Sequence, residues 1–299
     1  LCFYHYFCNK FKSSIMAKTY QKTKLQEVTI KGYKSIAFNR PVTLKLNDVS
    51  ILLGANGAGK SNIISFFRML SYMMSKSFGK YVEMSGTSNA LLHYGTKKTP
   101  VMSGEIKFSD SKSIDTYSFS LSNATPDRLI ITEERIVWHR KGRVKPYEVT
   151  LEPVFKESAL AESDNPVAKT IFQMLSYCKV YQFHDSSAEG PLRQVCPVET
   201  TNYLQSHGNN LPSFLLFLRD NYINSYNRIV DYVRDVVPQF QDFYLEPNNR
   251  FISLRWMDNS ATDYRFNAYQ FSDGSIRFIA LATLLLQPPQ TMPNVVILD

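Results

Sequence analysis

The segment GANGAGKS, residues 54–61, matches the phosphate-binding pattern GxxxxGK[ST] at every fixed position. An apolar run, Val49–Leu53, comes directly before it, and the segment Asn62–Leu70 after it has helical character. This order predicts a strand, a glycine-rich loop and a helix, which is the context that the pattern needs. The segment therefore predicts a site for a nucleoside triphosphate, and the alternative is a flexible glycine-rich loop that happens to carry a lysine.

The chemistry of such a loop explains its residue types. Glycines let the backbone curl until its N–H groups point at phosphate oxygens, and the following helix adds partial positive charge. Lys60 is expected to reach the β- and γ-phosphates, and the Ser61 hydroxyl is expected to bind Mg²⁺. The predicted nucleotide-contacting residues are Gly54, Ala55, Asn56, Gly57, Ala58, Gly59, Lys60, Ser61 and Asn62.

Composition sets broader limits. Of 299 residues, 34 are Lys or Arg and 26 are Asp or Glu, which gives a net charge of +8. This modest excess permits contact with a polyanion, although an evenly solvated basic surface has the same composition. The four cysteines (Cys2, Cys8, Cys178 and Cys196) form no CxxC pair, which argues against a zinc site or a disulfide framework. With no apolar stretch near 18 residues, we expect a cytoplasmic protein without a membrane partner.

The chain begins at Leu1, and residues 1–15 are aromatic without helical or strand regularity. They lack the basic start, apolar core and cleavage site of a secretory signal. We expect Met16 to be the true start and residues 1–15 to be a non-native leader. The alternative is an aromatic dimerisation arm.

Hydrophobic patterns predict the elements of the first half. Alternation over residues 25–46 predicts two strands joined by a turn at 39–41, and residues 101–153 predict an antiparallel meander. The helix after the loop has an apolar face suited to burial against a sheet, whereas residues 75–95 are expected to form a loop. The basic turn at residues 139–145 is interpreted as a solvated hairpin tip, with phosphate contact as the alternative.

In the second half, residues 167–178 are predicted to be helical and residues 179–183 to form a strand. Residues 212–236 predict one long helix, and short strands are expected at 243–245 and 251–256. A polar turn, Ser272–Ser275, precedes a strongly apolar helix, so Ser272, Asp273 or Ser275 is expected to cap its N-terminus. The final run, Val295–Asp299, predicts a buried parallel strand that brings a carboxylate to Mg²⁺.

Taken together, these motifs resemble the ABC-type ATPase heads of the RecF/SMC-like branch. More narrowly, the chain is similar to bacterial "AAA family ATPases", some of which serve in Septu-like and retron-associated antiphage systems. The resemblance covers about Lys24 to Asp299 and depends on residues 32–36, 54–62, 181–187, 271–278 and 295–299. It implies an α/β P-loop fold whose mixed sheet carries an antiparallel β lobe and a helical lobe, truncated at the C-terminus.

On this resemblance, residues 16–299 form one ATPase head. Its expected parts are a P-loop lobe (16–80), a β-rich insertion and loop region (81–200), a helical lobe with return strands (201–269), and the signature helix with the Walker B strand (270–299). The signature turn would close over the γ-phosphate held by a second subunit, which implies a homodimer with two sandwiched ATP molecules. The turn residues are Ser272, Asp273, Gly274 and Ser275; Asp273 replaces the usual glycine and Ser275 the usual glutamine.

The resemblance also places Lys34 near the nucleotide and makes Gln182 the loop glutamine that senses Mg²⁺. Gln194 is a second candidate for that role. Alternatively, Gln182 is an ordinary strand residue without a role in the site. His184 and Asp185 belong to the same loop or form a helix cap and its neighbour. The residues expected to act in catalysis are Asp299, Ser272 and Gln182, and those expected to bind Mg²⁺ are Ser61 and Asp299.

Family members carry a catalytic glutamate directly after the acid that Asp299 matches, and this chain stops at Asp299. We therefore expect it to bind Mg-ATP and hydrolyse it poorly. In the full-length protein, ATP hydrolysis is expected to be coupled to head dimerisation and to act on DNA or an effector nuclease, in repair or antiphage defence. The alternatives are a non-catalytic ATP-gated scaffold and a P-loop kinase or GTPase, which would leave Phe271–Phe278 without a role.

Overall fold

The computed structural model describes residues 23–152, 156–198 and 202–299. The proposed leader and the proposed start at Met16 lie outside these residues. The chain divides into two compact units. One contains the described residues within Leu1–Asn56 and Tyr72–Met174, and the other contains Gly57–Ser71 and those within Leu175–Asp299. A boundary therefore falls inside the predicted phosphate-binding loop, between Asn56 and Gly57.

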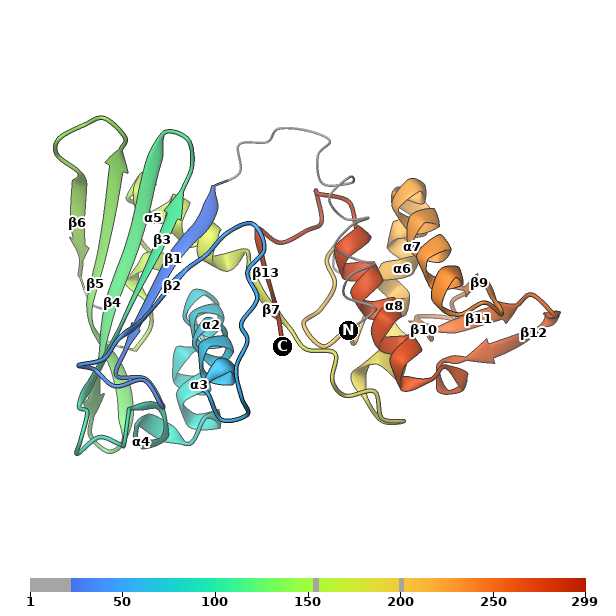
Figure 1. Cartoon of the computed structure of the whole chain (residues 1–299), viewed down its shortest axis with the longest axis horizontal. Helices are drawn as coiled ribbons and strands as arrows, with labels where there is room; N and C mark the ends of the chain where they lie inside the picture. Colours follow the sequence, from blue (N-terminus) through green and yellow to red (C-terminus); the bar gives the residue numbers. More distant parts are fainter. Residues whose placement is uncertain (1–22, 153–155, 199–201) are drawn as a thin grey trace. The chain divides into compact units, whose positions relative to one another are not determined.

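The first unit is built on a six-stranded antiparallel sheet with the order β2-β1-β3-β4-β5-β6 (Figure 1). Buried and partly exposed residues alternate along β3 and β4, because successive side chains of a strand point to opposite faces. The predicted meander is confirmed, and so is the pairing of β1 with β2. The strands are β1 (Lys24–Lys31), β2 (Val42–Lys45), β3 (Val101–Ser109), β4 (Ser113–Ala124), β5 (Arg128–Arg140) and β6 (Tyr147–Leu151).

Short helices accompany this sheet, and two of them correct the sequence prediction. The expected loop at 75–95 contains α3 (Phe78–Met84) and α4 (Thr87–Leu91), both of which contact β5. Their apolar side chains, including Phe78 and Leu91, are fully buried. Helices this short gain their stability from tertiary contacts, which a local pattern does not reveal. The unit also contains η1 (Ala159–Ala161) and most of α5 (Pro166–Ser176), where a helix was expected at 167–178.

A buried carboxylate ties the segment after β6 to the sheet. Glu134 has no exposed surface and accepts hydrogen bonds from the hydroxyls of Tyr117 and Ser158 and from the backbone N–H of Ala159. Burial, together with the adjacent Glu134 carboxylate, raises the pKa of Tyr117 well above its ordinary value. Since each donor has an acceptor, the polar group is compatible with this core.

The second unit contains the two strands predicted at 179–183 and 295–299, and they pair in parallel. Strand β7 (Cys178–Tyr181) pairs with β13 (Val295–Leu298), with Leu298 opposite Tyr181. Strand β13 is only partly buried, so the expected burial of Val295–Leu298 is wrong. Each strand of this two-stranded sheet has a neighbour on one side only, which leaves its side chains less covered than in a larger sheet.

The remaining strands of this unit form two small antiparallel sheets. One has the order β12-β11-β9 and the other pairs β8 with β10. Their bounds are β8 (Cys196–Pro197), β9 (Phe240–Tyr244), β10 (Phe251–Ile252), β11 (Arg255–Asp258) and β12 (Ala261–Asn267). Both expected strand regions are confirmed, although β10 and β11 divide the predicted strand at 251–256, and β12 had not been anticipated.

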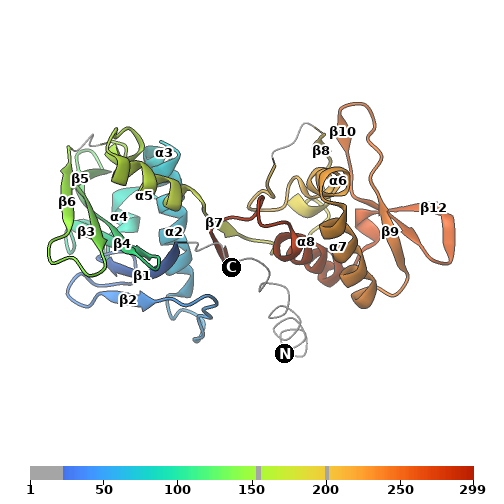
Figure 2. The ribbon, with the colours of Figure 1, turned by 90° about the horizontal axis from the view of Figure 1, so that it is seen from above.

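The predicted long helix at 212–236 is two helices, α6 (Leu211–Asn221) and α7 (Ile223–Val236). Tyr222 separates them with non-helical φ and ψ of −141° and 56°. Helix α7 packs on α6 and on α8 (Asp273–Leu286), and Figure 2 shows α7 beside α8. No proline or glycine stands at this break, so tertiary packing and not local helix propensity determines where α6 ends. Short 3₁₀ turns occur at η2 (Pro191–Arg193) and η3 (Ala268–Gln270).

An aromatic cluster anchors the start of α8. The Trp256 ring stacks on Phe271, with centroids 4.8 Å apart, and on Phe266 at 4.6 Å. Phe240 lies against both Trp256 and Phe271. Stacked aromatic pairs contribute about 0.5–1.5 kcal/mol beyond their area burial. The residue immediately before the predicted signature turn is therefore fixed by the core of the second unit.

The predicted helix after the phosphate-binding motif is confirmed as α2 (Lys60–Met74), which begins within the last two residues of the motif. Phe66, Met69 and Met73 have no exposed surface, which confirms a strongly buried apolar face. The described chain is thus mixed α/β, with an antiparallel sheet and several helices. None of the helices within the described ranges has both the length and the apolar character needed to cross a bilayer.

Candidate functional site

The phosphate-binding motif has the backbone that its glycines allow. Gly57 and Gly59 have φ of +81° and +93°, a left-handed region that side chains with a Cβ rarely adopt. A Cβ at Gly57 would meet nothing within 4 Å, so glycine is needed there for conformation and not for space. Gly59 accepts hydrogen bonds from the N–H groups of Asn62 and Ile63, which starts α2 directly at Lys60.

The loop from Gly54 to Ala58 is exposed, Lys60 is half-buried and Ser61 is exposed at the start of α2. Backbone N–H groups in the first turn of a helix have no partner further back in that helix and can receive an anion. The second unit therefore places a lysine, a hydroxyl and a helix N-terminus within two residues of each other.

The strand expected before this loop is not formed, which corrects the prediction for Val49–Leu53. These residues have no regular secondary structure, and Val49, Ile51, Leu52 and Leu53 are 70%, 52%, 40% and 89% exposed. A parallel strand needs neighbours for its backbone hydrogen bonds. Within the described ranges, no strand pairs with this run. Four large apolar side chains consequently remain exposed beside the motif.

Lys34 lies in the first unit at a constrained turn. Its φ is +48°, its N–H donates to the carbonyl of Leu91 at 2.8 Å, and its carbonyl lies 2.7 Å from His93 Nδ1. Its Nζ lies 5.5 Å from the centroid of the Tyr33 ring. The turn begins at Gly32, where a Cβ would lie 2.6 Å from the carbonyl oxygen of Val101. The structure thus fixes the backbone of Lys34, while its role near a nucleotide stays a prediction.

The parallel pairing of β7 and β13 brings two predicted site residues together. Asp299 follows β13, and its N–H donates to the carbonyl of Tyr181 at 3.1 Å. The Asp299 carboxylate accepts a hydrogen bond from Gln182 Nε2 and lies 3.6 Å from His184 Nε2. Because β7 and β13 run parallel, their carboxyl ends meet at one edge.

This geometry separates Gln182 from its rival. Gln194 Nε2 donates to the carbonyl of Glu189 at 3.0 Å, whereas Gln182 contacts the Asp299 carboxylate. Asp185 accepts from the N–H and the hydroxyl of Ser187, and these hydrogen bonds lower its pKa. Asp185 therefore caps a turn and not a helix, so the alternative of a helix cap is wrong. His184 and Gln182 both contact the Asp299 carboxylate.

The predicted signature turn forms a helix cap at α8. Ser272 Oγ accepts the N–H of Ser275 at 3.1 Å and lies 2.8 Å from the Ser275 hydroxyl. The N–H of Ile276 donates to the Ser272 carbonyl at 3.0 Å. The expected cap is confirmed and its residue is Ser272. Ser272, Asp273 and Gly274 are exposed, and Ser275 is partly buried, so the turn is accessible in a single chain.

Sequence reasoning missed Arg193, which organises this turn. Its side chain is only 5% exposed and donates to the carbonyls of Ser186, Ala268 and Phe271. It also lies 2.9 Å from Asp273 Oδ1. The ion pair gives a physical reason for an aspartate at the position where the resemblance expects glycine. No local motif marks Arg193, because all these partners except Ser186 are at least 75 residues away.

A second arginine joins the same segment to α8. Arg277 Nη2 donates to the carbonyl of His184 at 2.6 Å and to the hydroxyl of Ser186 at 2.9 Å. The segment 182–193, which we call the connecting segment, thus contacts Asp299 at one end and the signature turn at the other. Three separately predicted motifs are joined in one hydrogen-bonded arrangement within the second unit.

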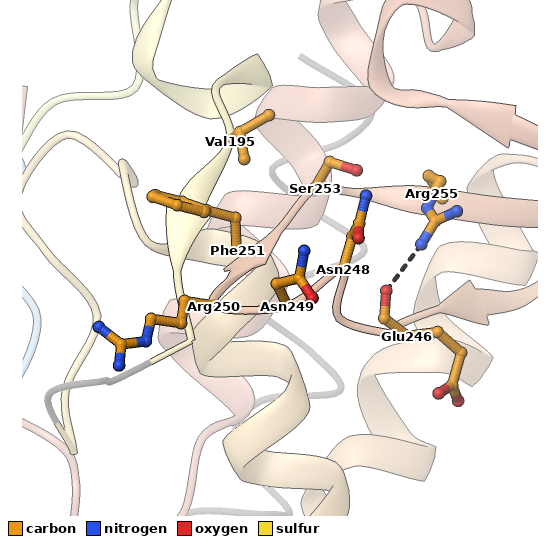
Figure 3. Close-up of a pocket in the computed structure, with 8 residues that line it drawn as sticks. All are labelled: Val195, Glu246, Asn248, Asn249, Arg250, Phe251, Ser253 and Arg255. Carbon is orange, nitrogen blue, oxygen red and sulfur yellow. Dashed lines mark hydrogen bonds between the residues drawn. The ribbon is translucent and has the colours of Figure 1, made fainter.

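A pocket in this unit is lined by none of the predicted site residues (Figure 3). Arg255 Nη2 donates to the carbonyl of Glu246 at 2.7 Å at its edge. Two guanidinium groups lie over the Tyr244 ring, those of Arg255 at 4.7 Å and Arg265 at 4.8 Å from the ring centroid. The pocket residues are Val195, Glu246, Asn248, Asn249, Arg250, Phe251, Ser253 and Arg255.

Clusters of side chains that could bind a metal ion were sought among the described residues. In the part of the chain that the structure describes, no group of three or more His, Cys, Asp or Glu side chains could hold a metal ion. A Mg²⁺ bound mainly by nucleotide phosphates and water needs only one or two protein oxygens, for which Ser61 and Asp299 are chemically suited. Burial raises the pKa of the Cys178 thiol to about 12, which makes a reactive thiolate unfavourable there.

No protein-family model matches this chain, and no curated protein matches it either.

Proposed function

We propose that this chain is an ATP-binding head of ABC type, in which ATP drives association of two copies through their signature turns. The proposal is supported by the glycine-dependent loop at residues 54–61, which opens directly into α2. It is supported equally by the resemblance of five separate motifs to such heads.

The observation that carries the proposal is the contact of Gln182 with Asp299. The connecting segment, which contains Gln182, is also hydrogen-bonded to α8 and its N-terminal cap. A hydrogen bond links Gln182 Nε2 to the Asp299 carboxylate across 117 residues of sequence. Arg277 and Arg193 then link the connecting segment to α8 and to Asp273. The alternative of a kinase or GTPase assigns no role to the exposed Ser272 cap or to its connection with Asp299 at the end of β13.

In this proposal the side chains have distinct tasks. Lys60 and the loop N–H groups would neutralise the phosphates, and Ser61 and Asp299 would supply hard oxygen ligands for Mg²⁺. Bound Mg²⁺ would neutralise charge on the β- and γ-phosphate oxygens. Gln182 and His184 orient the Asp299 carboxylate. Ser272 and the N–H groups near Gly274 would cap the γ-phosphate held by the other copy, using the helix-end dipole of α8.

ATP hydrolysis would then release the two copies, and the resulting movement would act on DNA or on an effector nuclease. A test begins with nucleotide binding, measured by titration calorimetry with Mg-ATP. Lys60→Ala should lose measurable binding, whereas Lys80→Ala, an exposed lysine on α3, should bind normally. Normal binding by Lys60→Ala would refute the assignment of the loop.

Association is tested separately by sedimentation with a non-hydrolysable ATP analogue. Ser272→Arg should retain ATP binding and lose nucleotide-dependent dimerisation, because a bulky side chain would occupy the place of the partner's γ-phosphate. Asn224→Arg, on the exposed start of α7, is the matched control. Unchanged dimerisation in Ser272→Arg would show that the copies do not associate through this turn.

A further inference from the structure

The β3–β4 and β5–β6 turns lie at the same end of the sheet in the first unit (Figure 1). Their residues form a cluster of cations. The β3–β4 turn contributes one lysine, and the end of β5 with the β5–β6 turn contributes four cations. All five side chains are exposed. We call this group the basic corner, and its members are Lys112, Arg140, Lys141, Arg143 and Lys145.

Hydrogen bonds hold the two turns together. The Lys141 N–H donates to the Lys112 carbonyl at 2.8 Å, and Lys141 Nζ donates to the Asp110 carbonyl at 2.5 Å. Within the second turn, the Arg143 N–H donates to the Arg140 carbonyl at 3.0 Å. The sequence shows four of the cations as one run, and the tertiary structure adds Lys112 to them.

The first turn is also fixed internally. Asp110 Oδ1 accepts the N–H groups of Lys112 and Ser113, both at 2.6 Å, and these hydrogen bonds lower the pKa of Asp110. Asp110 therefore stays ionised at neutral pH and offsets one of the five positive charges. The corner keeps a net charge of about +4, by the ordinary ionisation of its side chains.

Two cations elsewhere on the sheet form ion pairs with carboxylates. Lys107 pairs with Glu27 at 2.8 Å, and Arg135 pairs with Glu148 at 3.0 Å. By contrast, none of the five forms an ion pair with a carboxylate among the residues that the structure describes. Crowded like charges repel one another, and a bound polyanion would remove that cost.

The surroundings favour a nucleic acid over other polyanionic surfaces. Trp138 and Tyr147 are register partners on β5 and β6 at the base of the corner, and Tyr147 is 46% exposed. Such rings offer a stacking surface for bases beside phosphate-binding cations. A membrane surface would require apolar side chains to insert, and Val144 is the one large apolar side chain of the β5–β6 turn.

We propose that the basic corner binds the sugar–phosphate backbone of a nucleic acid. The basic corner contains no residue of the proposed nucleotide site. The proposal therefore assigns a nucleic-acid partner to the proposed ATPase and does not depend on ATP binding. If four cations contact phosphates of duplex DNA, log K should fall with log salt at a slope of about −3.6. Affinity would then fall about 150-fold between 50 and 200 mM KCl.

The test measures fluorescence anisotropy of a labelled 30-base-pair duplex and of one of its single strands with the full chain. Arg140→Gln combined with Arg143→Gln should reduce the duplex slope by about 1.8. The control combines Lys97→Gln with Lys98→Gln, two exposed lysines of the same unit, and removes the same charge. Thermal unfolding checks that both double variants are folded.

A reduced slope in the first double variant only, with either DNA, supports the proposal. Equal losses in both double variants would overturn it, because net charge alone would then explain binding. Binding to vesicles of anionic phospholipid without binding to DNA would overturn it in favour of a membrane contact. Lys60→Ala should bind DNA normally, so failure of the ATP proposal and failure of this one are distinguishable.

Discussion

Removal of the Arg193 guanidinium should uncouple the signature turn from the connecting segment. Arg193→Met retains most of the aliphatic stem and deletes the donors to Ser186, Ala268 and Phe271. It also leaves Asp273 without its partner at 2.9 Å. Because Arg193 is buried, this variant tests whether one side chain fixes the geometry of the turn.

The expected loss of unfolding free energy depends on how far each side chain is buried. Hydrogen bonds from a charged donor contribute about 1.5–3 kcal/mol each, and three backbone carbonyls share this guanidinium. The variant also removes the cost of burying the guanidinium charge, which offsets part of that sum. The expected loss of unfolding free energy is therefore about 3–5 kcal/mol. The Asp273 side chain is 67% exposed, so Asp273→Ala should cost no more than about 1 kcal/mol.

The assay uses the placement of the two tryptophans, one in each unit. Trp256 stacks on Phe271 next to the turn, so a Trp138→Phe background leaves fluorescence that reports on the second unit. Arg193→Met should lower the urea midpoint of this signal by about 2 M, for a denaturant dependence of about 2 kcal/mol per M. Arg250→Met, at an exposed arginine of the second unit, is the control and should change stability by less than about 1 kcal/mol.

Function supplies the second readout. Arg193→Met should bind Mg-ATP with wild-type affinity and lose nucleotide-dependent dimerisation, whereas Asp273→Ala should weaken dimerisation less. A stability loss below about 1 kcal/mol, together with normal dimerisation, would refute the reasoning that Arg193 positions the turn.

Three other predictions concern the first unit and the loop. Burial raises the pKa of Asp115 from 3.8 to about 6, so its contribution to stability is fully present below pH 3.8 and is lost as pH rises through 6. In the wild type, the free energy of unfolding should fall by at most about 3 kcal/mol between pH 4 and 7 because of this group. Urea titrations at each pH should show a smaller fall for Asp115→Asn. Glu134→Ala should cost about 3–5 kcal/mol in thermal or urea unfolding, because three buried donors lose their acceptor, and exposed Glu133→Ala should be nearly neutral. Gly59→Ala places a Cβ at a φ of +93° and should cost about 1–2 kcal/mol while weakening Mg-ATP binding in calorimetry; unchanged affinity would contradict the loop geometry.

Local patterns predicted what neighbouring residues decide by themselves. Alternation along β3 to β6 requires only that one face be buried, and the serine at position 272 has its capping partner three residues away. The start of α2 at Lys60 depends on glycines one and three residues upstream. These predictions succeeded because the determining contacts lie within a few residues of sequence or repeat with a simple period.

Failures occurred where distant contacts compete with local propensity. The run Val49–Leu53 has strand composition and no strand partner among the described residues, so its backbone remains irregular. Conversely, the polar stretch 75–95 forms α3 and α4 because Phe78 and Leu91 become buried. Hydrogen bonding and burial of this kind depend on which segments meet, and composition alone does not contain that information.

By itself, the sequence determined the glycine-rich loop, its helix, the antiparallel meander and the capped start of α8, because each depends on short-range spacing. The tertiary structure alone decided that Gln182 meets Asp299, that Arg193 pairs with Asp273, and that Lys112 joins the basic turn. Each of these contacts joins residues at least 29 positions apart. Chain folding brings them together because strand register and helix packing fix relative position, which local preference does not encode.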